Sequence, residues 1–205
     1  MHEQLRPEDL KLTPMRAARS FTTRAGVHGT LRPLAADDAP ALGRYFLGLS
    51  EDTKRRYGPH PFDQATADAF CATLDPERIL RMVAVLADTV PERIIGYMIL
   101  RLRLDAEECE RYAQYGIVLE PDRDCTIAPS VADEYQDQGL GSALFAQAVD
   151  VLHQLGRRYL LLQGGVYMTN ARAIHFYQKV GFRIVGEFEH PSSIRSYDMI
   201  LDLAV

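Results

Sequence analysis

The feature that most constrains the fold is a long helix that leads directly into a buried strand. Its apolar side chains recur at helical spacing and are Leu140, Leu144, Phe145, Ala148, Val151, Leu152 and Leu155. Gly156 predicts the end of the helix, because glycine accepts the left-handed backbone of a helix C-terminus. The continuous apolar run Tyr159–Leu162 that follows is typical of a buried strand. This unit favours an α+β or mixed α/β fold.

Two glycines stand where a strand and a short loop enter this helix. Gly139 and Gly141 allow a ligand to approach the backbone closely, and the free amides and dipole of a helix start suit a phosphate. The segment lacks the Gly-Lys-Ser/Thr ending of a P-loop, and Leu144 occupies the place of the third glycine of a dinucleotide-binding loop. The pattern alone leaves two interpretations open, a phosphate site and a tight contact between strand and helix.

The rest of the chain alternates strands and helices, with no internal repeat or linker. We expect helices over residues 37–49, 64–74 and 170–180, and strands over 28–34, 79–86, 94–104, 125–131, 183–187 and 196–203. Pro129 predicts a bulge or an end of pairing in its strand, because proline lacks the N–H of a ladder. Residues 105–123 are expected to form an elaborated connection. Residues 1–25 show little apolar periodicity and are expected to form a flexible arm before a single domain, residues 26–205.

Composition narrows the function classes. The 205 residues carry a formal net charge of −5, which argues against a nucleic-acid partner. No apolar stretch approaches the roughly 20 residues of a membrane helix, and no signal-peptide pattern is present, so we expect a cytoplasmic protein without a membrane partner. Cys71, Cys109 and Cys125 form no Cys-x-x-Cys pair, and no histidine shares a metal-ligand spacing with them. We therefore expect neither a disulfide framework nor a metal site.

A second motif lies one strand further along the chain. Asn170 opens a helix that carries Tyr177 and ends at Gly181-Phe182. Together with the segment Val131–Gly141, whose core is Gln136, two residues, Gly139, one residue and Gly141, it resembles the two consecutive cofactor motifs of the GNAT superfamily of acetyltransferases. The resemblance is sharp from Val131 to Phe182 and compatible from His28 to the C-terminus.

The resemblance implies a GNAT-like central, twisted, mixed β-sheet flanked by helices and splayed near Val131 to receive acetyl-coenzyme A. It also implies the cofactor-binding residues: the backbone of Val131 and Asp133 for the pantetheine arm; Gln136, Asp137, Gln138, Gly139, Leu140, Gly141 and Ser142 for the pyrophosphate; and Asn170, Ala173 and Tyr177 around the pantetheine and its thioester. No metal is implied.

The implied chemistry is direct attack of a neutral amine on the thioester carbonyl, with no covalent enzyme intermediate. The backbone amide near Val131 would donate to the oxyanion. Tyr177 would act as the catalytic acid toward the departing thiolate, since a phenol with a pKa of about 10 is protonated at neutral pH; a packed core tyrosine is the alternative. The general base stays unassigned: many relatives carry a carboxylate on the strand equivalent to 125–131, whereas here Asp124 and Glu134 flank it. A water chain or an acceptor that arrives partly deprotonated is also open.

The implied acceptor is a primary amine, on a small molecule or on a protein. The cluster Glu107, Glu108 and Glu110 either favours a cationic amine over long range or is a solvated face. The segment Leu49–Tyr57 resembles one that lines the acceptor site in some GNAT members, and a solvated charged turn is the alternative. The predicted function is thus an acetyl-coenzyme A dependent N-acetyltransferase. A non-catalytic acyl-coenzyme A sensing domain of the same fold is the other hypothesis, and a homodimer is left open.

Overall fold

The computed structural model describes residues 4–87 and 89–203. The first part of the chain forms α1 (Pro7–Leu12), β1 (Arg19–Thr22), β2 (His28–Pro33), α2 (Ala39–Gly48), α3 (Glu51–Tyr57), α4 (Gln64–Ala72), β3 (Ile79–Leu86), β4 (Ile94–Arg101) and α5 (Ala106–Ala113). The second part forms β5 (Cys125–Val131), α6 (Leu140–Gln154), β6 (Tyr159–Leu162), β7 (Val166–Tyr167), α7 (Ala171–Lys179), β8 (Arg183–Glu189) and β9 (Arg195–Asp202). Short 3-10 turns lie at Pro14–Ala17, Ala36–Asp38 and Asp133–Tyr135.

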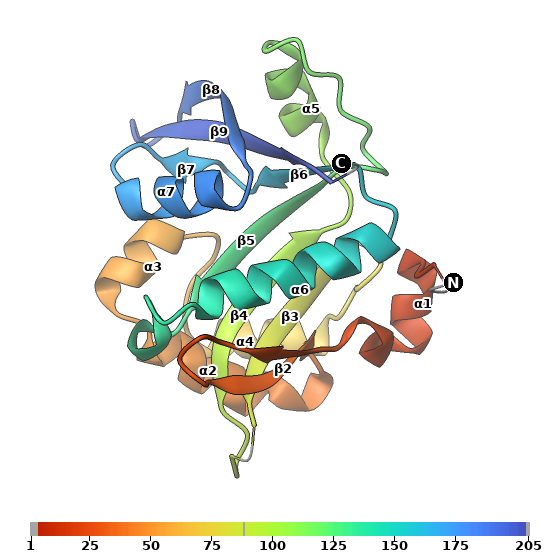
Figure 1. Ribbon diagram of the computed structural model, residues 1–205, viewed down its shortest axis with the longest axis vertical. Helices are drawn as coiled ribbons and strands as arrows, with labels where there is room; N and C mark the ends of the chain where they lie inside the picture. The colour runs from red at the N-terminus through yellow and green to blue at the C-terminus, as the bar shows by residue number, and fades with distance from the viewer. Residues whose placement is uncertain (1–3, 88, 204–205) are drawn as a thin grey trace.

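The strands form one twisted sheet in the order β1-β2-β3-β4-β5-β6-β9-β7, with β8 paired to β9 (Figure 1). β5 and β6 are parallel and the other pairs are antiparallel. The predicted fold, a mixed α/β sheet flanked by helices, is confirmed.

The sheet opens between β5 and β6. Their pairing covers Cys125–Ile127 and ends where the Gln163 amide donates to the Ile127 carbonyl at 3.0 Å, whereas β4 stays paired with β5 as far as Val131. The N–H and C=O groups of successive residues in a strand point to opposite neighbouring strands. The Ile127 carbonyl faces β6, so the N–H that Pro129 lacks would also have faced β6 and not β4. The predicted end of pairing is therefore found on the β6 side of Pro129, with no register shift against β4.

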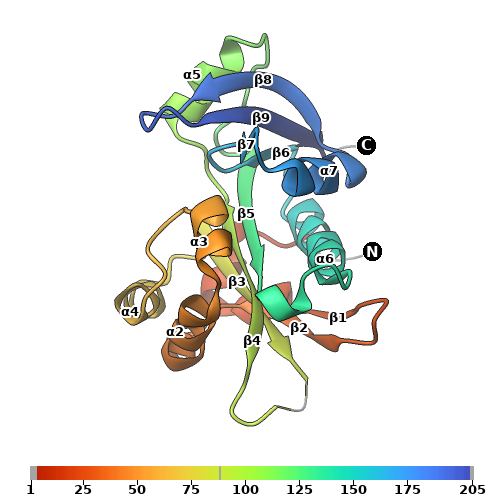
Figure 2. The ribbon, with the colours of Figure 1, turned by 90° about the vertical axis from the view of Figure 1, so that its left-hand side faces the viewer.

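Helices cover both faces of the sheet (Figure 2). Leu144, Ala148 and Val151 of α6 pack on one face with the N-terminal segment, and Leu42 and Phe46 of α2 pack with α4 on the other. The segment 105–123, expected as a connection, contains α5, whose Tyr112 packs against Leu161 and Ile200 beside β8 and β9. The open side of β5 thus lies between α6 and α7 on one hand and α3 on the other.

The N-terminal segment differs from the expected flexible arm. Leu5, Leu10, Ala17 and Phe21 are buried, β1 pairs with β2, and the Leu5 amide donates to the Gln154 carbonyl at 3.1 Å. Its buried residues follow no single period, because the chain changes from helix to 3-10 turn to strand within them. The division into an arm and one domain over residues 26–205 stays a prediction.

Candidate functional site

The first turn of α6 points open backbone amides toward the gap in the sheet. Gly139 is its N-cap residue with a φ of 82°, and the Ala143 amide makes the first helical bond, to the Gly139 carbonyl at 3.0 Å. The amides of Leu140, Gly141 and Ser142 precede that bond and have no partner within the helix. The buried side chain of Leu140 anchors this turn in the core, so the amides are held in a fixed direction.

The two glycines of this turn are not required by contact between strand and helix. A Cβ atom on Gly141 would meet its nearest protein atom, Phe176 Cε2, at 3.9 Å, and one on Gly139 would meet the Arg24 amide nitrogen at 4.0 Å. Gly96 behaves differently, because a Cβ there would lie 2.8 Å from Leu144 Cδ1. Gly139 is explained by its positive φ, while Gly141 leaves space that a ligand could fill.

The side chains of the loop before α6 form hydrogen bonds and ion pairs with neighbouring residues, which hold the loop in its conformation. Gln136 donates from Nε2 to the Val131 carbonyl at 3.1 Å and accepts from Arg172 at 2.8 Å. Arg172 also forms an ion pair of 3.3 Å with Asp137. The backbone of Asp137 is left-handed, with a φ of 59°. Gln138 donates to the Glu134 carbonyl. The Gln136 amide donates to the Asp133 carbonyl at 3.2 Å, so of these three residues Asp137 and Gln138 keep backbone amides for the predicted pyrophosphate contacts.

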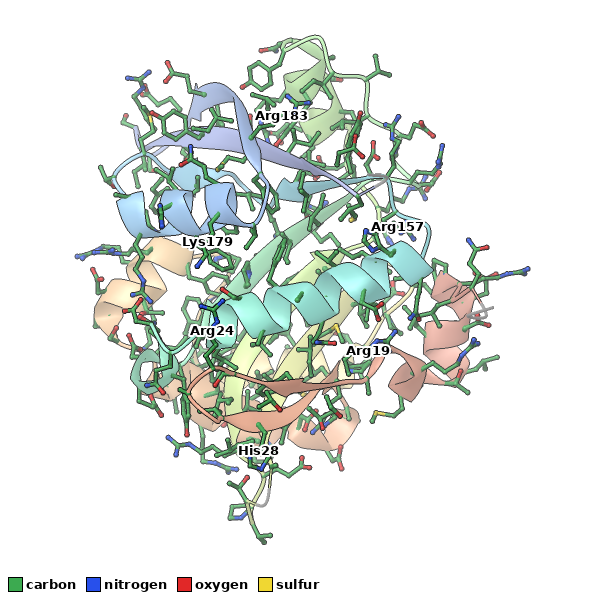
Figure 3. All side chains as sticks on the ribbon, viewed as in Figure 1. Arg19, Arg24, His28, Arg157, Lys179 and Arg183 are labelled. Atoms are coloured by element: carbon green, nitrogen blue, oxygen red, sulfur yellow. The ribbon has the colours of Figure 1, made fainter. Side chains whose placement is uncertain are left out.

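Two cations lie near this turn. Figure 3 shows Arg24 beside the start of α6 and Lys179 on α7 toward the same end. Within the described residues, neither side chain has an ion-pair or hydrogen-bond partner. No local pattern singles out Arg24, because its place depends on the β1–β2 turn, which brings its backbone next to Gly139.

The second motif forms the neighbouring wall. Asn170 caps α7 by accepting from the Ala173 amide at 3.2 Å. Tyr177 is half-buried and packs between Phe176 and Phe182, with ring centroids 5.3 Å from each. Burial raises the pKa of the Tyr177 phenol, and its hydroxyl has no hydrogen-bond partner in the part of the chain that the structure describes. The phenol is thus a protonated donor without a protein acceptor.

Asp133 links the opposite wall to this loop. Its carboxylate accepts from the Ser50 amide at 2.9 Å, the Ser50 hydroxyl at 2.7 Å and the Thr53 hydroxyl at 2.7 Å. Partial burial raises the pKa of this carboxyl, but the hydrogen bonds outweigh that effect and lower the net pKa. The side chain of Asp133 therefore fixes the start of α3, and its backbone remains for the predicted pantetheine contact.

Hydroxyl groups occupy the α3 side of β5. The Tyr45 hydroxyl and Ser130 Oγ are 2.8 Å apart, and the Tyr57 hydroxyl donates to the Ala128 carbonyl at 2.8 Å. Burial raises the pKa of both tyrosines. Sequence reasoning missed Tyr45 and Ser130, although period-2 alternation places Ser130 on the same face of β5 as Ala128.

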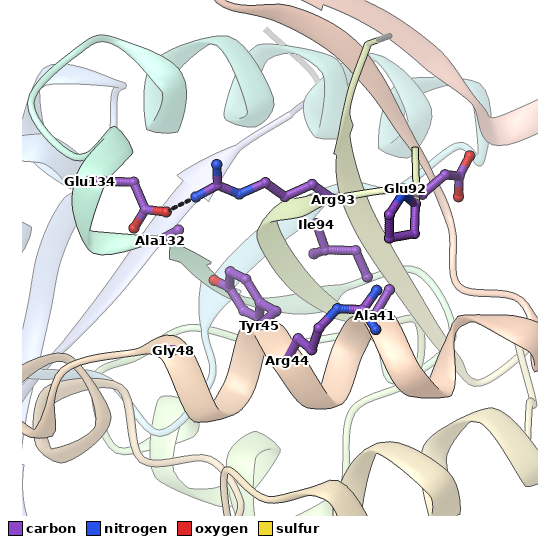
Figure 4. A pocket seen from close by; sticks show the side chains of 10 residues that line it. Ala41, Arg44, Tyr45, Gly48, Glu92, Arg93, Ile94, Ala132 and Glu134 are labelled. Atoms are coloured by element: carbon purple, nitrogen blue, oxygen red, sulfur yellow. Dashed lines mark hydrogen bonds and ion pairs between the residues drawn. The ribbon is translucent and has the colours of Figure 1, made fainter. Parts of the chain in front are cut away.

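The two carboxylates that flank β5 are already paired. Asp124 is fully buried and accepts from Arg158 Nη2 at 2.6 Å and from the Glu120 amide at 2.7 Å. Glu134 pairs with Arg93 beside a hollow of about 320 Å³ between α2 and the start of β4 (Figure 4). None of the predicted cofactor residues lines that hollow.

The described residues, 4–87 and 89–203, contain no group of three or more His, Cys, Asp or Glu side chains placed to hold a metal ion. Across the same ranges, every helix is too short or too polar to cross a membrane.

Comparisons with known proteins agree with the fold. The GNAT domain of S. lividans PAT is 20% identical and has a TM-score of 0.71 over 92% of this chain and 98% of that chain. RimJ of Mycobacterium smegmatis, solved with CoA-disulfide, is 16% identical with a TM-score of 0.66 over 90% and 86%. The ribosomal-protein-S18-alanine N-acetyltransferase of Escherichia coli is 22% identical with a TM-score of 0.56 over 85% and 94%.

A search of curated protein sequences finds no match. The sequence profile of the acetyltransferase (GNAT) family matches residues 46–182, which is most of the chain and includes β5, α6 and α7. The chain belongs to the GNAT acetyltransferase family.

Proposed function

We propose that this protein transfers the acetyl group of acetyl-coenzyme A to a primary amine, in the gap between β5 and β6. The observation that carries the proposal is the first turn of α6: amides without helical partners, a glycine with open space, and Arg24 beside them. Phosphate groups bind such helix starts. Acetyl-coenzyme A supplies the acetyl group as a thioester, and the relatives solved with coenzyme A species or named as N-acetyltransferases support this choice.

The residues of the chain then have separate tasks. The amides from Asp137 through Ser142 would hold the pyrophosphate, with Gln136 shaping the loop and Arg24 as a further cation. The open edge of β5 at Val131, with Asp133, Asn170 and Ala173, would orient the pantetheine. Tyr177 would hold a proton for the leaving sulfur, a role supported by the raised pKa of its phenol and by its hydroxyl, which has no hydrogen-bond partner among the described residues.

The segment Leu49–Tyr57 is proposed to line the acceptor side. It contains α3, whose Ser50 and Thr53 bind Asp133 and whose Tyr57 reaches β5. The relatives named here include a ribosomal-protein-S18-alanine N-acetyltransferase, which supports a protein amine, and a small-molecule amine is retained beside it. A cytoplasmic location and a homodimer stay predictions.

A non-catalytic acyl-coenzyme A sensing domain is the second candidate, because the carboxylates beside β5 are paired elsewhere. Calorimetric titration with acetyl-coenzyme A, followed by a free-thiol assay over an amine panel, separates the two. We expect one-to-one binding and amine-dependent thiol release. Binding without release on any amine would favour the sensor, and the absence of binding would contradict both.

A further inference from the structure

The carboxylates that surround β5 are each committed to a structural partner. Asp124 is paired with Arg158, Asp133 accepts three hydrogen bonds from Ser50 and Thr53, and Glu134 is paired with Arg93. Asp124 also lies at the first end of β5, where β5 is still paired with β6. For Asp133 these hydrogen bonds lower the pKa of the carboxyl, which makes it a weak base. Asp124 and Glu134 each have an oxygen turned to an arginine.

The hydroxyls on the α3 side of β5 cannot replace a carboxylate as a base. Tyr45 is bonded to Ser130, and Tyr57 donates its proton to the Ala128 carbonyl. Burial raises the pKa of both phenols, so neither is ionised at neutral pH. A neutral hydroxyl can accept a hydrogen bond from an amine N–H and thereby orient it, but it does not retain the proton.

His60, His190, Lys54 and Arg172 also have partners. His60 contacts the Pro61 carbonyl through Nδ1 at 2.7 Å, packs against Phe62, and burial lowers its pKa. His190 Nε2 lies 3.0 Å from the Ser196 hydroxyl. On α3, Lys54 pairs with Glu51, and Arg172 on α7 pairs with Asp137. Of these groups, His190 is the strongest rival base, since its ring packs edge-on against Tyr167 with the centroids 5.8 Å apart, and Tyr167 lies beside the end of α3 at Gly58.

We propose that no side chain within residues 4–87 and 89–203 removes the proton from the acceptor, so that the acceptor must be an amine with a substantial neutral fraction at cellular pH: the α-amino group of a peptide or protein N-terminus, not a lysine side chain. This inference rests on the proposed function. The amine lone pair forms the new C–N bond, the C–S bond breaks, and the sulfur takes the proton of Tyr177. The surplus amine proton goes to solvent, and solvent reprotonates Tyr177.

The pKa values of the two amine classes give the size of the effect. An α-amino group has a pKa of about 7.7–8.0 and a lysine side chain about 10.4. At pH 7 the neutral fraction of the α-amine is therefore larger by a factor of about 300. The less basic amine is also a weaker nucleophile, so we expect at least about a tenfold preference in kcat/KM.

Two matched peptides test the inference. One has a free N-terminal alanine and no lysine; the other has the same sequence with an acetylated N-terminus and one internal lysine. Thiol release is followed from pH 6.5 to pH 9.5 at saturating acetyl-coenzyme A. We expect the free α-amine to be preferred at pH 7, with kcat/KM rising tenfold per pH unit up to the pKa of the peptide itself. His190→Gln and Glu134→Gln should keep that apparent pKa.

Three results would overturn the inference. They are an equal or higher kcat/KM for the lysine peptide at pH 7, an acid limb set by His190 or Glu134 and lost in that variant, and thiol release with other amines but neither peptide. Failure of the proposed function looks different: acetyl-coenzyme A binds, and neither the peptides nor any amine of the panel releases thiol at any pH.

Discussion

The two walls of the gap between β5 and β6 are built on opposite principles. On the α6 side, backbone amides at the helix start and the side chains of Arg24 and Tyr177 have no protein partner within the described residues. On the α3 side, polar side chains bind one another: Asp133 with Ser50 and Thr53, Tyr45 with Ser130. We infer that the first wall is kept open for a ligand, while the second is a rigid surface. Substitutions on the α6 side should therefore act mainly on ligand binding or turnover, and substitutions on the α3 side mainly on folding stability.

The largest expected effect is on turnover at Tyr177. General acid catalysis typically contributes about a hundred- to ten-thousand-fold, so Tyr177→Phe should lower kcat by a factor in that range and leave acetyl-coenzyme A affinity nearly unchanged. Because burial raises the pKa of the phenol, the proton stays in place through neutral pH, and the alkaline limb of the wild-type rate profile should lie above the ordinary phenol pKa of about 10. Steady-state rates across pH check both points. A variant that turns over within a few-fold of wild type, with the same profile, would return Tyr177 to a packing role.

The next effect is on affinity at Gly141. Valine at this position meets no close protein atom at its Cβ, but it fills the space before the open amides. Gly141→Val should weaken acetyl-coenzyme A binding at least tenfold, about 1.4 kcal/mol, and change folding by less than about 1 kcal/mol.

The matched contrast is Gly96→Val, whose Cβ would lie 2.8 Å from Leu144 Cδ1. It should lower the melting temperature strongly because the core must shift. Calorimetry measures the acetyl-coenzyme A affinity of both variants, and thermal melting measures their stability. Together they distinguish a glycine that leaves space for the ligand from one required by core packing. Unchanged affinity in a folded Gly141→Val protein would contradict the pyrophosphate assignment.

On the α3 wall, Asp133→Asn should act first on stability. The change weakens hydrogen bonds from Ser50 and Thr53 and should cost about 1–2 kcal/mol in the free energy of unfolding. The folded pKa of Asp133 is lowered, so this contribution is fully present above the ordinary carboxyl pKa of about 3.9 and is lost as pH falls through the lower folded value. Denaturant curves of wild type and variant should differ at pH 7 and converge in acid. A difference that persists after the Asp133 carboxyl of the folded wild type has been protonated would exclude the charge as its source.

Asn170→Ala should give the smallest change. Loss of the bond to the Ala173 amide removes an N-cap worth about 1 kcal/mol, and we expect cofactor affinity to fall together with stability. Melting with and without acetyl-coenzyme A checks this. A lower melting temperature with a full ligand-induced shift would leave Asn170 as a structural cap alone.

Sequence reasoning succeeded where an element is held by its own residues. The bounds of β3, β5 and β6 were predicted to the residue. Those of α6 and α7 were predicted within one residue or so, because each helical pattern ends at a glycine, Gly156 or Gly181. It missed α3, which has no buried residue; Asp133, 83 positions away, binds its first turn. A local signal for α5 was available, since Asp105 and Glu108 form a capping box.

For the site, the motifs predicted which residues hold the cofactor, and this assignment stays a prediction. The structure places Gly139 and Gly141 at the start of α6, and Asn170 and Tyr177 at the cap and on the body of α7. The pairing of Asp124 with Arg158 and the approach of Arg24 to Gly139 depend on long-range packing. No local pattern could have predicted them.

The central claim is that the start of α6 holds the pyrophosphate of acetyl-coenzyme A. Its most direct test is a calorimetric comparison of acetyl-coenzyme A with S-acetylpantetheine, which has the same thioester arm and no pyrophosphate. We predict one-to-one binding of acetyl-coenzyme A, at least tenfold weaker binding of S-acetylpantetheine, and loss of most of that difference in Gly141→Val. Equal affinity for the two compounds in the wild-type protein would contradict the claim.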